Sequence, residues 1–189
     1  MRKKIVLFLF LFCSIITSAQ HKVTVSSPDR KLRFSLQVTP EDLSYEVDYK
    51  KQSIITNSLL GFDFDSGEFC SNLLVGKVRR KSIDETYKLL VGKVSIARNH
   101  CNEAVIPLQE PTTDRRINLI VRVFNDGVAF RYEFPEQEGW RSYVMYDELD
   151  EFRLERNPKT TALFLPSYTS SHEGLYTKAG YQRLEENKL

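Results

Sequence analysis

The sequence lacks the short motifs that identify many enzymes. Its 189 residues contain no glycine-rich phosphate-binding loop and no Gly-x-Ser-x-Gly elbow. Neither nucleotide chemistry nor the usual hydrolase nucleophile therefore has support from the sequence. No internal repeat marks a solenoid or a propeller, and no low-complexity linker divides the chain. These absences favour one folded domain without a local catalytic signature.

Long hydrophobic runs are also scarce, and the longest one lies near the N-terminus. The positive residues Arg2–Lys4 precede an apolar run, Ile5–Ile16, and the small residues Thr17–Ala19 follow it before Gln20. A membrane-spanning helix needs about 20 apolar residues, whereas this run has 12, so no membrane span is expected. The pattern predicts a secretory signal peptide over residues 1–19 and an exported chain, either periplasmic or secreted.

Charge of one sign is not concentrated in the rest of the sequence. The whole chain has 27 Lys and Arg against 25 Asp and Glu. Without the three cations of the signal peptide the count is 24 against 25, a net charge of −1. Nucleic-acid binding requires clustered Lys and Arg, so no nucleic-acid partner is expected. The densest basic run, Arg79–Lys81, is interpreted as solvated surface.

Cysteine is rare, with three residues in the whole chain. Cys13 lies within the signal peptide, and a lipid anchor there is disfavoured because Phe12 occupies the position that should hold a small residue. Cys70 and Cys101 could form a disulfide after export or could remain unpaired, and the sequence leaves both alternatives open.

Short runs of Val, Ile, Phe, Tyr and Leu recur from Gln20 onward, and turn residues interrupt them. Within Leu32–Val38 the apolar residues alternate strictly, which places them on one buried face of a strand. The early segments predicted as strands are Lys22–Val25, Leu32–Thr39, Ser44–Lys50 and Leu60–Asp65.

The clearest local signal is a hairpin formed by Arg116–Phe124 and Val128–Phe134. The intervening Asn-Asp-Gly tolerates the positive φ angles of a tight turn. Helix is expected only over Asp147–Phe152 and Tyr181–Leu189. The pattern therefore predicts a mainly β fold, a β-sandwich, over residues 20–189.

Two segments contain residue types suited to a site. His100 and Glu103 have the spacing of metal ligands on a helix, but in a strand they point to opposite faces. A hydrogen-bonded structural histidine is therefore favoured over a metal site. Pro166–Tyr176 is a polar loop after an apolar strand, Ala162–Leu165, and Tyr168 and Tyr176 flank its carboxylate, Glu173. Loops on rigid sheets are common places for sites, although an isolated surface carboxylate is equally ordinary.

Several ordered segments resemble the N-terminal domain of glycoside hydrolase family 97. These segments are Asp84–Tyr87, Arg98–Glu103 and Leu119–Tyr132, together with Ser27–Asp29 and His172–Tyr176. The resemblance implies a mutarotase-like β-sandwich that packs against a (β/α)8 barrel. The family is typified by exported α-glucosidases and α-galactosidases, so an α-linked oligosaccharide is the implied substrate. Within the motifs, Tyr87 stands where Trp is expected and Cys101 where an aromatic residue is expected.

The resemblance also implies how the site is divided between the two domains. The barrel supplies both catalytic carboxyl groups, and the sandwich supplies one calcium ligand, which is Glu173 in this sequence. Calcium is thus a cofactor only of the full-length enzyme. The sandwich is expected to continue beyond Leu189, so the chain by itself should be inactive, marginally folded and weak in calcium binding. Preference for glucosides or galactosides, and inversion or retention, depend on the barrel.

The alternative function is a stand-alone carbohydrate-binding accessory module. Such a module needs an exposed aromatic platform, and Trp140, Tyr143 and Tyr146 form the compact aromatic cluster outside the clear strands. Packing in the core is the favoured interpretation of this cluster.

Overall fold

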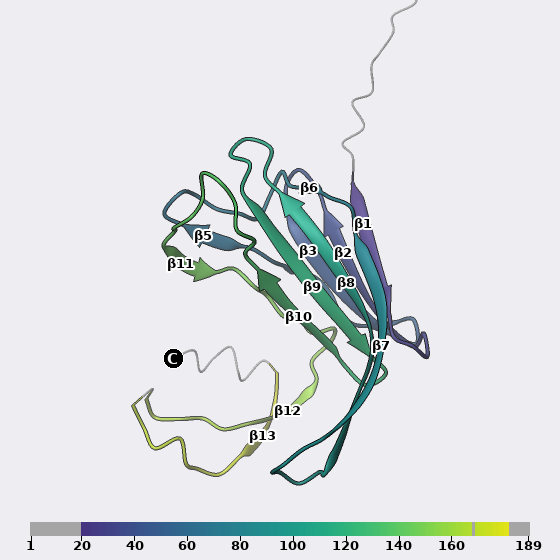
Figure 1. Ribbon diagram of the computed structural model, residues 1–189. Helices are drawn as coiled ribbons and strands as arrows, with labels where there is room; N and C mark the ends of the chain where they lie inside the picture. Colours follow the sequence, from purple (N-terminus) through teal and green to yellow (C-terminus); the bar gives the residue numbers. More distant parts are fainter. Residues whose placement is uncertain (1–19, 168, 182–189) are drawn as a thin grey trace, which may run out of the picture.

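The structure is a computed structural model that describes residues 20–167 and 169–181, and every regular element in that part of the chain is a β-strand (Figure 1). The strands are β1 His21–Ser26, β2 Leu32–Val38, β3 Leu43–Tyr49, β4 Gln52–Leu59, β5 Phe62–Phe64, β6 Leu74–Val75, β7 Arg79–Lys88, β8 Ile96–Gln109, β9 Arg116–Phe124, β10 Val128–Glu133, β11 Met145–Glu148, β12 Lys159–Ala162 and β13 Thr177–Gly180. The predicted signal peptide lies outside the described residues.

Two antiparallel sheets form the body of the molecule. The first is a meander in the order β1-β2-β3-β4. The second has the order β10-β9-β8, and β6 and β7 pair with different parts of the far edge of β8. Two small sheets, β5 with β11 and β12 with β13, lie beside them (Figure 1). The mainly β, sandwich-like prediction is confirmed.

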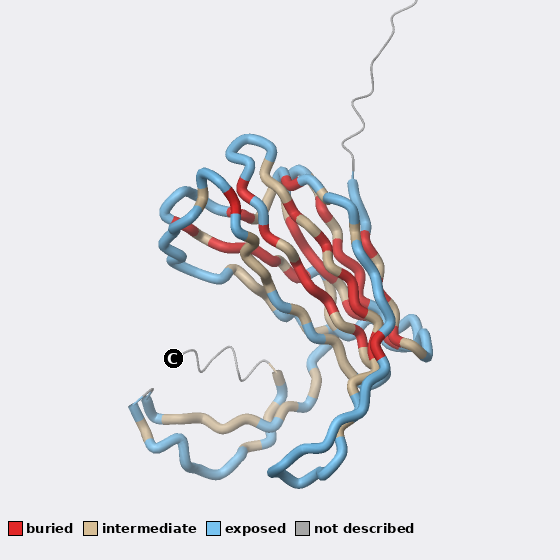
Figure 2. Tube along the Cα trace, in the orientation of Figure 1, coloured by how far each residue is buried: buried red, intermediate tan, exposed pale blue. Residues whose placement is uncertain are grey.

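The core lies between the two main sheets, where the buried segments of Figure 2 are concentrated. The predicted face of β2 is confirmed, because Leu32, Phe34, Leu36 and Val38 are all buried. Burying each such side chain stabilises the fold by about 1.5–3 kcal/mol. Within the first sheet, Phe34 stacks on Tyr45 at a centroid distance of 5.4 Å. Phe130 of β10 joins the two layers, because its ring meets Tyr45 edge-on at 5.5 Å.

The predicted hairpin is confirmed as β9 and β10, with Val123 opposite Val128. The alternate residues of β9 from Ile117 to Val123 are fully buried. The prediction for its turn is wrong, because none of the three residues Asn125–Gly127 has a positive φ. The turn closes instead with a hydrogen bond of 2.8 Å from the Phe124 N–H to the Gly127 carbonyl.

The helix predicted over Asp147–Phe152 is also wrong. The segment begins in β11 and continues as extended chain beside the end of β4. Its backbone N–H groups donate to the first sheet, from Leu149 to the Gly61 carbonyl at 2.8 Å and from Glu151 to the Leu59 carbonyl at 2.9 Å. These bonds replace the internal bonds of a helix. Of the other predicted helix, Tyr181–Leu189, only Tyr181 is described, and it lies in a turn.

A buried arginine connects the small β5–β11 region to the second sheet. Arg115 precedes β9, and its side chain is 4% exposed. Its guanidinium binds both carboxylate oxygens of Glu110, at 2.8 and 2.9 Å. It also donates to the carbonyls of Gly67 and Glu68, each at 2.9 Å. No motif or periodicity in the sequence indicates this network.

Candidate functional site

Glu173 lies in the connection between β12 and β13, which pair from Lys159–Gly180 to Ala162–Thr177. The apolar strand predicted over Ala162–Leu165 is displaced in the structure, since the observed strand β12 ends at Ala162. The carboxylate of Glu173 is exposed. Two apolar neighbours are exposed as well, Leu175 by 93% and Tyr176 by 70%. Tyr168, the other aromatic residue predicted to flank this loop, lies outside the described residues.

The described residues do not by themselves complete a donor set for calcium. Residues 20–167 and 169–181 contain no group of three or more His, Cys, Asp or Glu side chains that could hold a metal. Calcium takes 6–8 oxygen ligands, so Glu173 could supply one ligand but the described residues do not form a calcium site by themselves.

His100 and Glu103 do not form a metal site, because both lie on β8 at positions that point to opposite faces of the sheet. Glu103 is buried and binds Arg122 at 2.6 Å and Lys81 at 3.2 Å. Burial opposes ionisation of Glu103, but these two cations outweigh it and hold the pKa of the carboxyl below its usual range. His100 lies opposite Asp84 of β7. In the described part of the chain we find no hydrogen bond to its imidazole, so the hydrogen-bonded alternative is not supported.

Two acids that no sequence motif indicated, Glu148 at the end of β11 and the nearby Asp150, lie close together in the chain. Hydrogen bonding with Asp150, burial and the charge of Asp150 raise the pKa of Glu148. Asp150 also accepts a hydrogen bond of 2.7 Å from the Tyr132 hydroxyl. The two acids and Tyr132 therefore form a small polar cluster at the end of β11.

Of the predicted aromatic cluster, Trp140 packs against the fold, whereas Tyr143 and Tyr146 are exposed. Trp140 is half-buried, stacks on Tyr143 at a centroid distance of 4.7 Å and meets Phe64 edge-on at 5.1 Å. Tyr146 is exposed and belongs to β11. The interpretation of Trp140 as a packing residue agrees with this geometry.

A group of exposed apolar side chains lies at the projecting end of the β7–β8 hairpin. The apolar side chains exposed there are Tyr87, Leu89, Leu90, Val91, Val94 and Ile96. Leu90 is 100% exposed and Val91 86% exposed. Figures 1 and 2 show this hairpin extending past the sandwich as an exposed arm. Soluble proteins rarely expose contiguous apolar groups of this kind except at interaction surfaces.

The two remaining cysteines are unpaired: Cys70 is half-buried and Cys101 is buried. No helix in the described ranges is long and apolar enough to cross a membrane.

Comparison with known proteins gives consistent matches. A family model described as Glycosyl-hydrolase 97 N-terminal matches residues 25–189. The retaining alpha-galactosidase of Bacteroides thetaiotaomicron is 24% identical over 186 residues, which is 98% of this chain and 26% of that protein. A probable retaining alpha-galactosidase of Streptomyces bingchenggensis is 26% identical over 178 residues, which is 92% of this chain and 27% of that protein.

Solved structures agree with these matches. A glycoside hydrolase family 97 enzyme from Pseudoalteromonas sp. strain K8, solved with panose, superposes with a TM-score of 0.74 at 26% identity, covering 82% of this chain and 24% of that one. A beta-arabinopyranosidase superposes with a TM-score of 0.71 at 29% identity, covering 82% of this chain and 26% of that one. The chain therefore spans about a quarter of the length of the proteins it matches.

Proposed function

The chain belongs to the glycosyl-hydrolase 97 N-terminal family, and we propose that it forms the non-catalytic N-terminal portion of an exported α-glycosidase. In this proposal a separate (β/α)8 barrel supplies the catalytic carboxyl groups and binds an α-linked oligosaccharide. The names of the alpha-galactosidase relatives support an α-linked substrate.

The observation that carries the proposal is the exposed apolar surface of the domain. Leu90 is fully exposed and Val91 almost fully exposed at the end of the β7–β8 hairpin. Leu175 and Tyr176, which follow Glu173, are also exposed. Burying a leucine against a partner is worth about 1.5–3 kcal/mol. A partner that covers these side chains would therefore gain enough free energy for stable docking. We assign this partner as the catalytic barrel, which would bring Glu173 to the domain boundary.

Glu173 is proposed to supply one carboxylate to a calcium ion at that boundary. The remaining ligands would come from the barrel, because the described residues do not complete the set that calcium needs. Bound calcium would act as a Lewis acid that orients groups at the scissile bond.

The docking proposal is tested with the catalytic domain produced separately. The double substitution Leu90→Ser with Val91→Ser should weaken association with that domain by at least about tenfold, since two apolar contacts of more than about 1 kcal/mol each are lost. The thermal unfolding of the isolated chain should change little, because both side chains are exposed. Unchanged association would refute the docking surface.

The calcium proposal is tested in the assembled enzyme. Glu173→Gln should raise the calcium concentration needed for activity, whereas Glu41→Gln, at an exposed turn between β2 and β3, should not. Equal calcium dependence of the two variants would contradict the role of Glu173.

Titration of the isolated chain with maltooligosaccharides distinguishes the accessory-module alternative from the proposed function. A stand-alone carbohydrate-binding module requires a change in Trp140 fluorescence at millimolar sugar, whereas the proposed function does not.

A further inference from the structure

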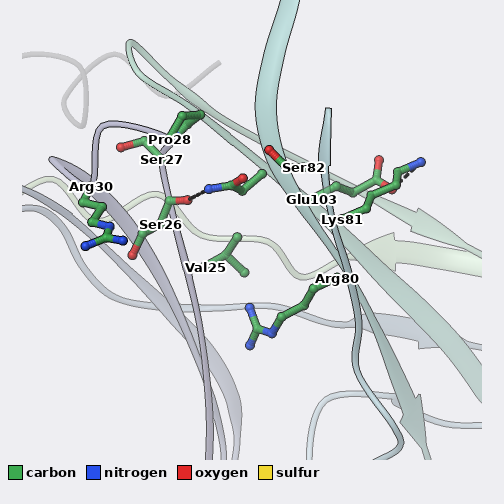
Figure 3. Close-up of a pocket in the computed structure, with 10 residues that line it drawn as sticks. Val25, Ser26, Ser27, Pro28, Arg30, Arg80, Lys81, Ser82 and Glu103 are labelled. Carbon is green, nitrogen blue, oxygen red and sulfur yellow. Dashed lines mark hydrogen bonds and ion pairs between the residues drawn. The ribbon is translucent and has the colours of Figure 1, made fainter. Parts of the chain in front are cut away.

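A pocket of about 560 Å³ opens at one edge of the sandwich. It lies between β1, the edge strand of the first sheet, and β7, the edge strand of the second. Arg30 comes from the turn after β1, Arg80 and Ser82 come from β7, and Asn102 comes from β8. Figure 3 shows the Arg30 and Arg80 side chains on the two sides of the opening. This pocket is distinct from the Glu173 loop and from the apolar hairpin end.

The walls of the pocket are held by hydrogen bonds between the two sheets. Arg80 Nη1 donates to the Thr24 carbonyl at 2.8 Å. Asn102 Nδ2 donates to the Ser26 carbonyl at 2.8 Å. Both bonds use only part of each side chain, so the remaining donors of Arg80 and the amide oxygen of Asn102 are available to a ligand.

The charge around the pocket is positive and only partly neutralised. Glu103 is the carboxylate among the lining residues, and it is already bound by Lys81 and Arg122. Asp29, next to Arg30, pairs with Lys31 at 3.0 Å. Within the described residues neither Arg30 nor the free side of Arg80 has a carboxylate partner. Two guanidinium groups thus face one pocket with uncompensated charge.

The surroundings strengthen this positive field. Arg30 also lines a neighbouring hollow, where the cations Lys31, Arg33, Lys50 and Lys51 outnumber the one carboxylate in its lining, Asp48. Arg30 has a φ of 61° and Lys51 a φ of 67°, in the left-handed region that Asn and Gly adopt more easily. Clustered cations with low-dielectric walls attract anions over a distance of several ångströms.

We propose that this pocket binds the oxyanion of an acidic ligand, a carboxylate, sulfate or phosphate group. Guanidinium forks match the geometry of such groups and hold them by paired, charge-assisted hydrogen bonds. Ser82 and Asn102 add hydroxyl and amide groups that suit a hydroxylated body attached to the anion. The proposal is independent of the docking and calcium roles above.

The test uses the chain from Gln20 to Leu189 and two probes, sodium D-glucuronate and inorganic phosphate, titrated at constant ionic strength by NMR. The signals of the Asn102 side-chain amide should shift with at least one probe, and D-glucose should leave them unchanged. The probe that binds more tightly distinguishes an acidic sugar from a free anion. Failure of both probes to shift these signals would overturn the proposal.

Two variants with the same loss of charge complete the test. Arg30→Asn removes the guanidinium from the pocket and should weaken binding by about tenfold or more. Lys51→Asn removes one positive charge at another left-handed turn position, outside the pocket, and should weaken binding far less than Arg30→Asn, because Lys51 contributes only to the surrounding field. Asparagine tolerates the local φ in both cases, so both variants should fold. Equal weakening by the two variants would show a diffuse charge effect and would also overturn the proposal.

Discussion

Replacing Arg115 by Met should destabilise the domain strongly, and much more than deletion of the exposed ion pair between Arg98 and Asp84. The substitution keeps an apolar stem of similar length but removes the guanidinium. The carboxylate of Glu110 would then lose two hydrogen bonds, and the carbonyls of Gly67 and Glu68 would lose their donors. Breaking a buried pair by removing one partner costs about 3–5 kcal/mol. Here the remaining charge is on Glu110, whose side chain is 13% exposed and therefore largely shielded from water.

This cost is a large fraction of the total stability of a domain. Single domains have free energies of unfolding of about 5–15 kcal/mol. For a domain of this size each kcal/mol corresponds to roughly 2–4 °C in Tm. The Arg115→Met variant should therefore unfold roughly 6–20 °C below the wild type.

The acid dependence of unfolding should change together with the stability. Burial opposes ionisation of Glu110, but the hydrogen bonds and charge of Arg115, with a hydrogen bond from Thr113, hold the pKa of Glu110 below its usual value. A carboxyl group whose pKa is lower in the folded state than in the unfolded state stabilises the fold at pH values above its unfolded-state pKa. This contribution is lost as the pH falls through its folded-state pKa. Without Arg115, the loss of stability from pH 7 to below about pH 4 should be smaller than in the wild type.

Urea unfolding at pH 7, followed by Trp140 fluorescence, measures this effect, since the Arg115 guanidinium lies 5.8 Å from the Trp140 ring. The matched control is Arg98→Met, which removes the two hydrogen bonds of 2.8 Å between Arg98 and Asp84 on the exposed part of the second sheet. Exposed pairs contribute little in water. Equal losses in the two variants would refute the argument that burial decides the cost.

Two further predictions concern close packing and the acid pair. Gly61→Ala should cost about 1–3 kcal/mol, because the added Cβ would lie 2.9 Å from the Phe69 carbonyl oxygen. Gly127→Ala, which meets no atom within 4 Å, should be neutral in the same urea titration. Glu148→Gln should stabilise the domain at pH 7 by less than about 1 kcal/mol, because the raised pKa of Glu148 means that ionisation beside Asp150 is unfavourable in the folded state. This gain should vanish below pH 4.5, the ordinary value of Glu148; a gain that persists there would contradict the argument.

The sequence predicted best those strands whose side chains alternate. Leu32–Val38 and Arg116–Phe124 carry a two-residue period, and both strands occur with the expected buried faces. β4 was missed because Gln52–Leu59 is mostly polar and has no clear alternation. Its place in the sheet follows from pairing with β3 on one side and with the segment after β11 on the other.

For the candidate site residues, too, the sequence predicted features that depend on neighbouring residues and missed those that depend on tertiary packing. The ordered motifs identified the family, and the strand context of His100 and Glu103 argued against a metal site. Tyr132 and Asp150 could not have been paired from the sequence, because 18 residues separate them and no periodicity relates them. The cationic pocket was also hidden, because Arg30 comes from the turn after β1 and Arg80 from β7, an edge strand of the other sheet.

The β class of this protein, its main buried faces and its family could be predicted from the amino-acid order, because period-two alternation and ordered motifs are properties of neighbouring residues. Which polar groups meet could not be predicted in this way. The pairing of the buried Arg115 with Glu110, the bond from Tyr132 to Asp150, and the positions of Arg30 and Arg80 depend on how the sheets pack and how their edges align. Charges gain or lose free energy according to neighbours and solvent exposure, and neither is encoded in local spacing.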